Sequence, residues 1–389
     1  MCDVPALRFP EFTEEWEKVR LGDNCNIQMC KRIMAAQTNT EGGVPFYKIG
    51  TIGSKADAYI SKDLFDEYKM KYSFPHKGEV MITCAGTVGK CIIYNGEDSY
   101  YQDSNIVWID NPDKIILNDF LYHLLSRINW SRLNSTTIVR IYNDDLRNLK
   151  LYCPRHDEQK KITKFLSLID KRIETQNKII EKYESLIKGL VVTHYSTIPH
   201  TIKVKIQDLG EAYSTMVMSK EQLTNDGNPC IFYGELFTLY GCVIGEIKSR
   251  TSLEKVSSTL SHGRDLLFPA STTVDALSLI APSALMQKGI ILGGDMFGIK
   301  VAETYNPIYL SYYFNYIANK RLSKYAKGTT IIHLHYNEIA NVAIELPDIE
   351  EQDKIVSTIL GYSTKLSVEE AILEKLSDLK QYLLKQMFI

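Results

Sequence analysis

The triplet Glu158-Gln159-Lys160 is the stretch whose residue types most directly suggest chemistry. A Glu-x-Lys triplet near other acidic groups can hold a divalent cation beside a phosphate, as metal-dependent nucleases do. That chemistry also requires a strand with a Pro-Asp pair shortly upstream, and the nearest such pair, Pro112-Asp113, lies too far away. The competing interpretation is that the triplet forms the polar first turn of a helix.

A second copy of the stretch decides between these interpretations. Residues 136–190 and 329–383 align without a gap, and the second copy carries Glu351-Gln352-Asp353. The Glu-Gln pair therefore persists, whereas the lysine does not. Each pair follows a proline, Pro154 or Pro347, where an acidic side chain suits the positive end of a helix dipole and Glu or Gln can cap exposed amides. The pair is thus predicted to mark a helix start.

A heptad pattern follows the Glu-Gln pair in both copies, with seam residues at alternating steps of four and three. A seam sustained over about four heptads predicts a helix of roughly 45 Å that packs against another helix. The first seam is Ile162, Leu166, Ile169, Ile173, Gln176, Ile180, Tyr183, Ile187 and Leu190. The second is Ile355, Ile359, Tyr362, Leu366, Glu369, Leu373, Leu376, Lys380 and Leu383.

Polar interruptions in the seams predict how the two helices pair. Gln176 and Glu369 occupy the same repeat position, at the midpoint of each seam. Midpoints meet in an antiparallel pair, so the Gln176 amide is expected to donate to the Glu369 carboxylate and to fix the register. A basic excess in 155–190 and an acidic excess in 348–389 favour the same pairing. Lys380 faces either the first helix or a partner subunit.

The remaining sequence predicts two similar globular domains of the α/β (α+β) class. VRLGD at 19–23 resembles VKIQD at 204–208, whereas the sequences that follow diverge. Short apolar runs between turn residues predict a mostly antiparallel, curved sheet with one main helix in each domain. The predicted order is a globular domain at 1–150, a spacer helix at 151–197, a globular domain at 198–343 and a spacer helix at 344–389. The two helices are expected to form an antiparallel coiled coil within a pseudo-two-fold internal repeat.

The composition excludes several classes of protein. No apolar run is long enough to span a bilayer, and the N-terminus lacks the basic start and apolar core of a signal peptide. The eight cysteines form no Cys-x-x-Cys pair and no zinc-like cluster, so reduced thiols and a cytoplasmic location are expected. The formal net charge of −2 gives no general affinity for nucleic acid, so DNA binding would need a local basic surface.

Two further motifs are too weak to define a site. CAGTVGK at 84–90 lacks the P-loop spacing, because only two residues separate Gly86 from Gly89, and a tight hairpin turn is expected instead. His333-Leu334-His335 has the spacing of a metal pair on one strand face, yet Arg140-Ile141-Tyr142 stands there in the first copy. No metal site, cofactor site or catalytic residue is predicted in the chain.

Stretches that interleave Lys or Arg with aromatic and small polar residues are candidates for nucleic-acid contact, since cations bind phosphates while polar groups meet bases. They are MCKR (29–32), KMKYSFPHK (69–77) and NKRLSKYAK (319–327), with polar loops at 84–90 and 271–275. A solvated helix face or a plain surface hairpin explains any one of them equally well. The candidate residues are Lys31, Arg32, Lys71, Thr83, Thr87, Lys90, Gln102, Lys220, Tyr240, Ser271, Thr272, Lys324 and Lys327.

From end to end, the chain resembles the specificity subunits of type I restriction-modification systems. The resemblance lies in PALRFPEFTEEWEKVRLGD (5–23), VKIQDLG (204–210), GEVMIT with GTVGK, GRDLLFPAS and the repeated Pro-x-x-x-Glu-Gln-x-x-Ile signature. It implies two target recognition domains that each read half of a split DNA site through the major groove, spaced by two helices. It also implies two methyltransferase subunits that hold S-adenosylmethionine, and nuclease/translocase subunits that use Mg²⁺ and ATP, while this chain is not catalytic.

Three functions make different predictions. A DNA reader within a restriction-modification complex should recognise an asymmetric split site, because identical readers would give a palindrome. A nuclease should place Glu158 and Lys160 on a strand beside another acidic ligand. A coiled-coil scaffold should bind DNA without site preference, and a DNA-binding protein outside a restriction system is the last alternative.

Overall fold

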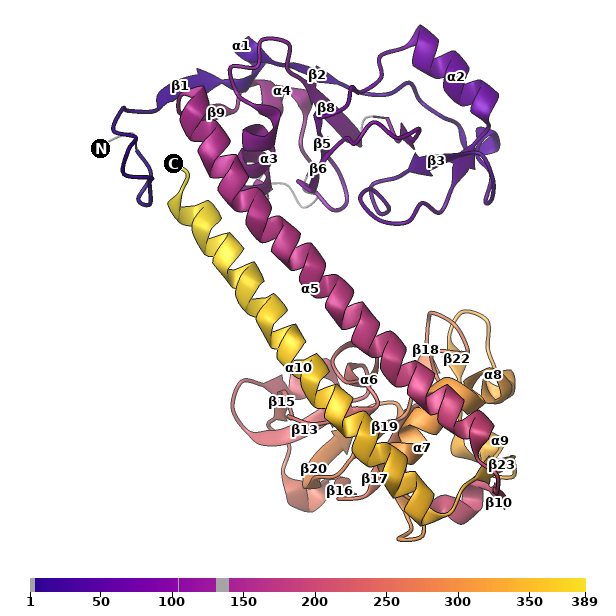
Figure 1. Ribbon diagram of the computed structural model, residues 1–389. Coiled ribbons are helices and arrows are strands. Elements are labelled where there is room, and N and C mark those ends of the chain that lie inside the picture. The colour runs from indigo at the N-terminus through magenta and orange to yellow at the C-terminus, as the bar shows by residue number, and fades with distance from the viewer. Residues whose placement is uncertain (1–3, 104, 131–139) are drawn as a thin grey trace. The chain divides into compact units, whose positions relative to one another are not determined.

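The computed structural model describes residues 4–103, 105–130 and 140–389 (Figure 1). The chain divides into unit 1, formed by Met1–Asn177 with Ala371–Ile389, and unit 2, formed by Lys178–Glu370. Each unit contains one globular domain and one end of each long helix. Among the described residues, no helix combines the length and apolar character needed to cross a membrane.

The two long helices begin at the predicted Glu-Gln pairs. Helix α5 runs from His156 to Thr197, and α10 runs from Ile349 to Gln386. The Asp348 carboxylate accepts a hydrogen bond of 2.9 Å from the backbone N–H of Glu351, so it caps the start of α10. The prediction of two helix starts is confirmed. Because Glu158 and Lys160 lie in α5, the strand that the nuclease hypothesis requires is absent at this position.

Unit 1 is built on a four-stranded antiparallel sheet in the order β2-β8-β5-β6. Helix α3 (Asn118–Arg127) packs against β5 and β6, and its apolar face is buried in the same core as the start of α5. The strands are β2 (Asn26–Gln28), β5 (Val80–Thr83), β6 (Cys91–Ile93) and β8 (Ile106–Asp110). The predicted antiparallel sheet is confirmed for this domain.

A second, smaller sheet in unit 1 was not predicted. Its order is β4-β3-β7, with β3 (Val44–Tyr47), β4 (Tyr59–Ile60) and β7 (Tyr100–Tyr101). Helix α2 (Lys62–Lys71) is as long as α3, at 10 residues, so the prediction of one main helix is wrong for this domain. The pattern was missed because only Phe65 of α2 is fully buried and the rest of the helix is largely charged.

Unit 2 contains two five-stranded sheets. One has the order β11-β21-β17-β19-β14 and the other the order β12-β15-β13-β20-β16, and most of their pairs are antiparallel. The first comprises β11 (Gly210–Ser214), β14 (Val243–Ile244), β17 (Asp265–Pro269), β19 (Ser283–Leu285) and β21 (Met296–Val301). The second comprises β12 (Leu223–Thr224), β13 (Asn228–Phe232), β15 (Ser249–Thr251), β16 (Leu260–His262) and β20 (Lys288–Gly293).

Unit 2 has one main helix, as predicted. Helix α7 (Pro307–Tyr313) continues through a π-helical turn at Phe314–Ala318 into α8 (Asn319–Leu322). Helix α7 packs against β17 and β19, and Phe268 of β17 stacks on Phe297 of β21 with ring centroids 4.9 Å apart. Shorter helical segments are α1 (Leu21–Asn24), α4 (Asn143–Arg147), α6 (Glu235–Thr238) and α9 (Tyr336–Ile339).

The sequence repeat is also a repeat of local structure. In unit 1, β1 (Glu17–Arg20) pairs with β9 (Lys150–Cys153), and in unit 2, β10 (Ile202–Lys205) pairs with β23 (Ala343–Leu346), in the same relative register. The backbone N–H of Ile141 donates to the Cys84 carbonyl over 2.9 Å, and that of Leu334 donates to the Ala270 carbonyl over 2.9 Å. The loops after β5 and β17 therefore occupy corresponding places.

The turns that lead into β5 and β17 are duplicated as well. Glu79 accepts a hydrogen bond of 2.7 Å from the backbone N–H of His76, and Asp265 accepts one of 2.7 Å from that of His262. Tyr213 also donates its hydroxyl to Asp265 over 2.5 Å. Burial raises the pKa of Glu79, and burial beside the Asp265 carboxylate raises the pKa of Tyr213. The His-x-x-acid turns fix where each central strand begins.

Within each unit, the start of one long helix lies beside the end of the other. In unit 1, Lys380 Nζ lies 2.5 Å from Asp170 Oδ1, so Lys380 faces the first helix. In unit 2, His194 Nε2 lies 3.1 Å from Glu351 Oε1. The order is antiparallel in both units, as predicted. The apolar residues at these ends are Ile162, Leu166, Ile169, Leu383, Leu384 and Met387 in unit 1 and Ile187, Val191, Ile355 and Ile359 in unit 2.

Apart from Gln176, the residues at the centres of the two seams are less buried than those at the ends. Gln176 is 1% exposed, whereas Glu369 is half-buried. Their mutual hydrogen bond stays a prediction. The remaining predicted seam positions are half-buried: Ile173, Ile180, Tyr183, Leu190, Tyr362, Leu366, Leu373, Leu376 and Lys380.

Candidate nucleic-acid interface

The Gly-rich loop of unit 1 joins the antiparallel strands β5 and β6, but at residues 84–90 it is longer than the tight hairpin turn that was predicted. Gly86 and Gly89 have φ values of 65° and 84°, which favour glycine. A Cβ on Gly89 would lie 2.1 Å from Trp130 Cδ1, so the loop is packed closely on that ring. Thr83 is fully buried, and its hydroxyl donates to the Thr87 carbonyl and accepts from the Lys90 N–H. Thr83 therefore braces the loop, while Thr87 is exposed.

Three of the predicted contact residues of unit 1 meet around the segment 48–53. Lys90 donates its ammonium group to the Ile52 carbonyl, and Gln102 Oε1 accepts from the Ile49 N–H at 3.4 Å. Arg32 and Gln102 line one shallow cavity of about 370 Å³. The structure thus brings together residues that are far apart in the sequence, at the side of the domain that carries the loop.

Arg32, Lys71 and Lys31 already have partners within unit 1. Arg32 Nε donates to Asp103 Oδ2 over 2.8 Å, although the arginine side chain stays 63% exposed. Lys71 pairs with Glu67 at the end of α2, with 2.8 Å between Nζ and Oε1. The Lys31 ammonium lies 5.3 Å from the centroid of the Tyr72 ring. These contacts are exposed and therefore weak enough to exchange for a phosphate.

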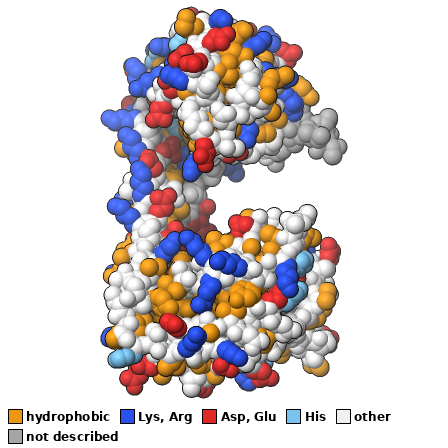
Figure 2. All heavy atoms as spheres, turned by 90° about the vertical axis from the view of Figure 1, so that its right-hand side faces the viewer, with side chains coloured by type: hydrophobic (Ala, Val, Ile, Leu, Met, Phe, Trp, Pro, Cys, Tyr) orange, Lys and Arg blue, Asp and Glu red, His pale blue; other side chains and the backbone are white. Residues whose placement is uncertain are grey.

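A two-stranded antiparallel ribbon carries the corresponding candidates in unit 2. Strand β18 (Ser271–Thr272) pairs with β22 (Ile332–His333), and Lys327 is bridged to His333 by backbone hydrogen bonds of 2.9 and 2.7 Å. Lys324 lies in the turn just after α8 and is exposed. Lys and Arg side chains gather on the face of unit 2 drawn in Figure 2. A two-stranded ribbon is narrow enough to enter a major groove.

The loop after β18 is held by its own polar side chains. Thr272 is 9% exposed, and its hydroxyl oxygen accepts from the Val274 N–H at 3.2 Å. The Ser278 hydroxyl donates to the Asp275 carbonyl over 2.7 Å. Thr272 therefore shapes the loop, as Thr83 does in unit 1, and Ser271 remains half-buried at the ribbon.

Two candidates of unit 2 lie away from the ribbon. Lys220 is exposed in a short helical turn at Lys220–Gln222 that precedes β12. Tyr240 follows α6, and its hydroxyl accepts from the Lys248 N–H at 3.1 Å. Burial raises the pKa of Tyr240. Both residues belong to elements other than β18 and β22, so they are not part of the ribbon.

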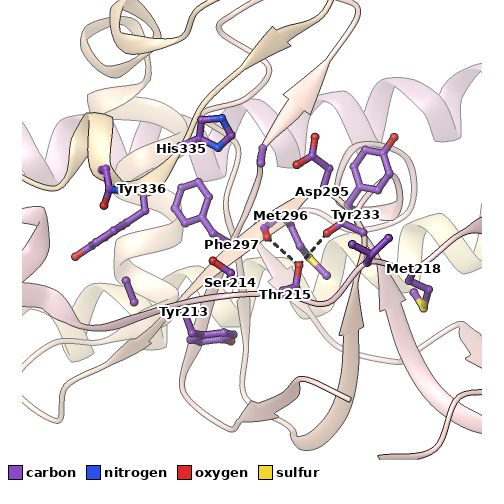
Figure 3. Close-up of a pocket in the computed structure, with 15 residues that line it drawn as sticks. Tyr213, Ser214, Thr215, Met218, Tyr233, Asp295, Met296, Phe297, His335 and Tyr336 are labelled. Carbon is purple, nitrogen blue, oxygen red and sulfur yellow. Dashed lines mark hydrogen bonds between the residues drawn. The ribbon is translucent and has the colours of Figure 1, made fainter. Parts of the chain in front are cut away.

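A groove beside β21 was missed by sequence reasoning (Figure 3). Its volume is about 930 Å³, and Thr215 at its floor donates to the carbonyls of Gly294 and Met296 over 2.9 and 2.8 Å. Asp295 connects the groove to the ribbon, since its Oδ2 lies 3.9 Å from His333 Nδ1. The aromatic lining comes from Tyr213, Tyr233, Phe297 and Tyr336. These residues come from four separate segments, so no local motif reveals the groove.

Glu158 has a structural partner. Its two carboxylate oxygens accept hydrogen bonds of 2.7 and 2.8 Å from Arg8 Nε and Nη2. The Glu158 side chain is 3% exposed and that of Arg8 13% exposed. Of the described residues, no group of three or more His, Cys, Asp or Glu is arranged to hold a metal ion. The carboxylate is thus committed to a bidentate ion pair.

Comparison with known proteins gives a consistent result for both halves. The family model described as "Type I restriction modification DNA specificity domain" matches residues 13–185 and again residues 201–378. A putative type I restriction enzyme specificity subunit from Haemophilus influenzae is 48% identical over 169 residues, which is 43% of each chain. That match spans less than half of the relative's length. A putative type I restriction enzyme MjaX specificity subunit from Methanocaldococcus jannaschii is 23% identical, over 95% of this chain and 92% of that one.

A solved structure shares the fold across the whole length. The crystal structure of a type I restriction-modification system S subunit from M. genitalium superposes with a TM-score of 0.58 at 15% identity. The match covers 99% of both chains. The chain therefore shares its fold with a solved structure over almost its whole length.

Proposed function

Because the chain belongs to the family of the type I restriction modification DNA specificity domain, we propose that each unit reads one half of an asymmetric, bipartite DNA site. The chain is a recognition subunit and not an enzyme. The observation that carries the proposal is the double family match, one per unit, on two domains with the same frame and different loops. Different readers in the two units give an asymmetric site, whereas identical ones would give a palindrome.

The two long helices are proposed to form one antiparallel coiled coil that sets the distance between the half-sites. The antiparallel contacts at both ends support this, as do the polar residues Gln176 and Glu369 at the seam midpoints. The pseudo-two-fold relation between the units is part of the same proposal.

The proposed partners are double-stranded DNA, two methyltransferase subunits and, where the system cleaves DNA, nuclease/translocase subunits. Methylation of a base requires that it be flipped out of the duplex, so a separate reader must position the methyltransferase. S-adenosylmethionine would then be held by the methyltransferase, and Mg²⁺ and ATP by the nuclease/translocase. The proposed location of the complex is the cytoplasm.

Exchanging residues 200–342 for the equivalent block of another specificity subunit should change one half of the methylated site and leave the other half unchanged. The reason is that the loops of unit 2 lie within that block, while those of unit 1 do not. The measurement is a genome-wide map of N6-methyladenine in cells that express the chain with its methyltransferase. A change in both halves or in neither would overturn the proposal, and sequence-independent binding would favour the scaffold alternative.

The lysines beside the ribbon of unit 2 are proposed to bind phosphates. The double substitution Lys324→Gln, Lys327→Gln should weaken DNA binding and lower the slope of log K against log salt by about 1.8, at about 0.9 per phosphate contact. On binding DNA, the exposed Lys327 would exchange its present partner, Glu338, whose carboxylate lies 3.0 Å from the lysine ammonium group, for a phosphate. Binding of the methyltransferase complex to its site, measured over a series of salt concentrations, gives the slope.

Lys300→Gln is the matched control for the two lysines. Lys300 is also exposed and also faces a glutamate, with Nζ 4.0 Å from Glu211 Oε2. It lies near the C-terminal end of β21, whereas Asp295 beside the ribbon precedes the other end. The control should keep the wild-type slope. An equal fall in both variants would mean that general charge, and not the ribbon, determines the salt dependence.

A further inference from the structure

The Gln159 side chain connects the spacer helix to the globular domain of unit 1. It is fully buried at the first turn of α5. Its Oε1 accepts from the Leu117 N–H at 2.7 Å, and its Nε2 donates to the carbonyls of Ile115 and Pro154 over 2.9 and 2.8 Å. Both ends of the amide are therefore satisfied by backbone groups of two different segments.

Gln352 makes the same connection in unit 2. It is fully buried, its Oε1 accepts from the Asn306 N–H at 2.9 Å, and its Nε2 donates to the Pro347 carbonyl over 2.9 Å. A second bond reinforces the link, because Asn306 Nδ2 donates to Asp353 Oδ1 over 2.7 Å. The glutamine of the Glu-Gln pair thus has the same role in both copies.

The target of each glutamine is the start of the domain's main helix. Leu117 and Asn306 are the N-cap residues of α3 and α7. In a capping box, a Glu or Gln three residues into a helix accepts from the N-cap N–H of its own helix. Here the side-chain oxygen of a glutamine in the spacer helix accepts a hydrogen bond from the backbone N–H of the N-cap residue of the main helix. The prediction that the pair caps the helix it begins is therefore wrong for the glutamine.

The main helices lead on to the candidate DNA loops. Helix α3 packs against β5 and β6, which carry the 84–90 loop between them. Helix α7 packs against β17, which leads directly into the ribbon strand β18. A rotation of either main helix about its start would therefore move the loops relative to the spacer helix.

We propose that Gln159 and Gln352 are positioning residues that hold each recognition domain at a fixed angle on its spacer helix and thereby define the accepted distance between the half-sites. This inference rests on the proposed function. One base pair adds about 3.4 Å and about 35° of twist between half-sites. A buried amide with directional bonds on both sides resists such a rotation, whereas an apolar side chain of similar size does not.

The test uses the complex with its methyltransferase and duplexes whose spacer is native or changed by one base pair. We expect the wild-type complex to methylate the native duplex on the order of tenfold faster, a factor that corresponds to about 1.4 kcal/mol. Gln159→Leu should reduce the ratio of the two methylation rates several-fold. Mismatches within either half-site should lower the methylation rate by the same factor as in the wild-type complex. Gln352→Leu should reduce it less, since the Asn306–Asp353 bond remains.

Asn111→Leu is the matched control. Asn111 is 5% exposed and holds the same segment from within the domain, with Nδ2 donating to the Ile116 carbonyl and to Asn118 Oδ1 over 2.5 and 2.8 Å. It should lower the melting temperature without changing spacer preference. If both glutamine variants keep the wild-type spacer preference, or if Asn111→Leu alters it equally, the inference is overturned. A wild-type complex without a bipartite site would instead overturn the proposed function.

Discussion

Glu158→Ala is expected to lower the free energy of unfolding of unit 1 by about 3 kcal/mol, because it leaves the Arg8 guanidinium without the carboxylate that it faces. This expected loss is at the lower end of the range for breaking a buried ion pair, because the Arg8 side chain is 13% exposed. The pair also joins the N-terminal segment to α5. All three tryptophans, Trp16, Trp108 and Trp130, lie in unit 1, so tryptophan fluorescence in a urea titration reports on this unit alone.

The second copy supplies the control for this substitution. Glu351 holds the corresponding position, but its side chain is 36% exposed and its partner is His194. Hydrogen bonding to His194 lowers the pKa of Glu351. Glu351→Ala should leave the tryptophan transition unchanged, because the pair lies in unit 2. Adding Arg8→Ala to Glu158→Ala should recover part of the lost stability. An unchanged midpoint for Glu158→Ala would show that the ion pair does not hold the N-terminal segment.

The contrast between Arg8 and Glu158 shows what the sequence could and could not predict. The Glu-Gln pair was recognisable as a helix start because the repeat kept it while Lys160 changed. Its partners were not recognisable, since Arg8 is 150 residues away from Glu158. A weak signal existed, because Arg8 and His194 precede β1 and β10 by nearly the same number of residues. The structural repeat therefore begins before the first residues that are similar in sequence.

The candidate contact residues show a similar limit. Lys324 and Lys327 lie exposed beside the ribbon, as their spacing with aromatic and polar residues indicated. Thr83 and Thr272 are candidates because polar side chains in loops can meet bases, yet both use the hydroxyl to brace their own loop. Residue type cannot distinguish these roles, because an internal hydrogen bond satisfies a hydroxyl as well as an external one does. The smaller sheet of unit 1 was hidden for another reason: two of its strands, β4 and β7, have only two residues each, which is too short to show a period.

His123→Leu is expected to remove an acid-sensitive part of the stability of unit 1. His123 is 3% exposed on α3, and burial lowers its pKa to about 4, with Asp170 and Lys380 as the charged groups nearby. The pKa of a histidine in the unfolded chain is near 6.5. Below that pH, the unfolded chain therefore binds a proton at His123 that the folded chain does not bind. Stability is therefore complete above about pH 6.5 and falls as the pH drops towards 4. The total loss is on the order of 3 kcal/mol.

Tryptophan-monitored urea unfolding between pH 7 and pH 4.5 would measure this loss. The wild-type free energy should fall more steeply than that of His123→Leu, whose stability at pH 7 should be at least equal, because no described residue hydrogen-bonds the buried His123 Nδ1. Ile116→Val, in the same core, should lower stability by about 1 kcal/mol at every pH and keep the wild-type slope. Equal slopes for wild type and His123→Leu would mean that His123 becomes protonated without unfolding. The acid sensitivity of unit 1 would then have to come from groups other than His123.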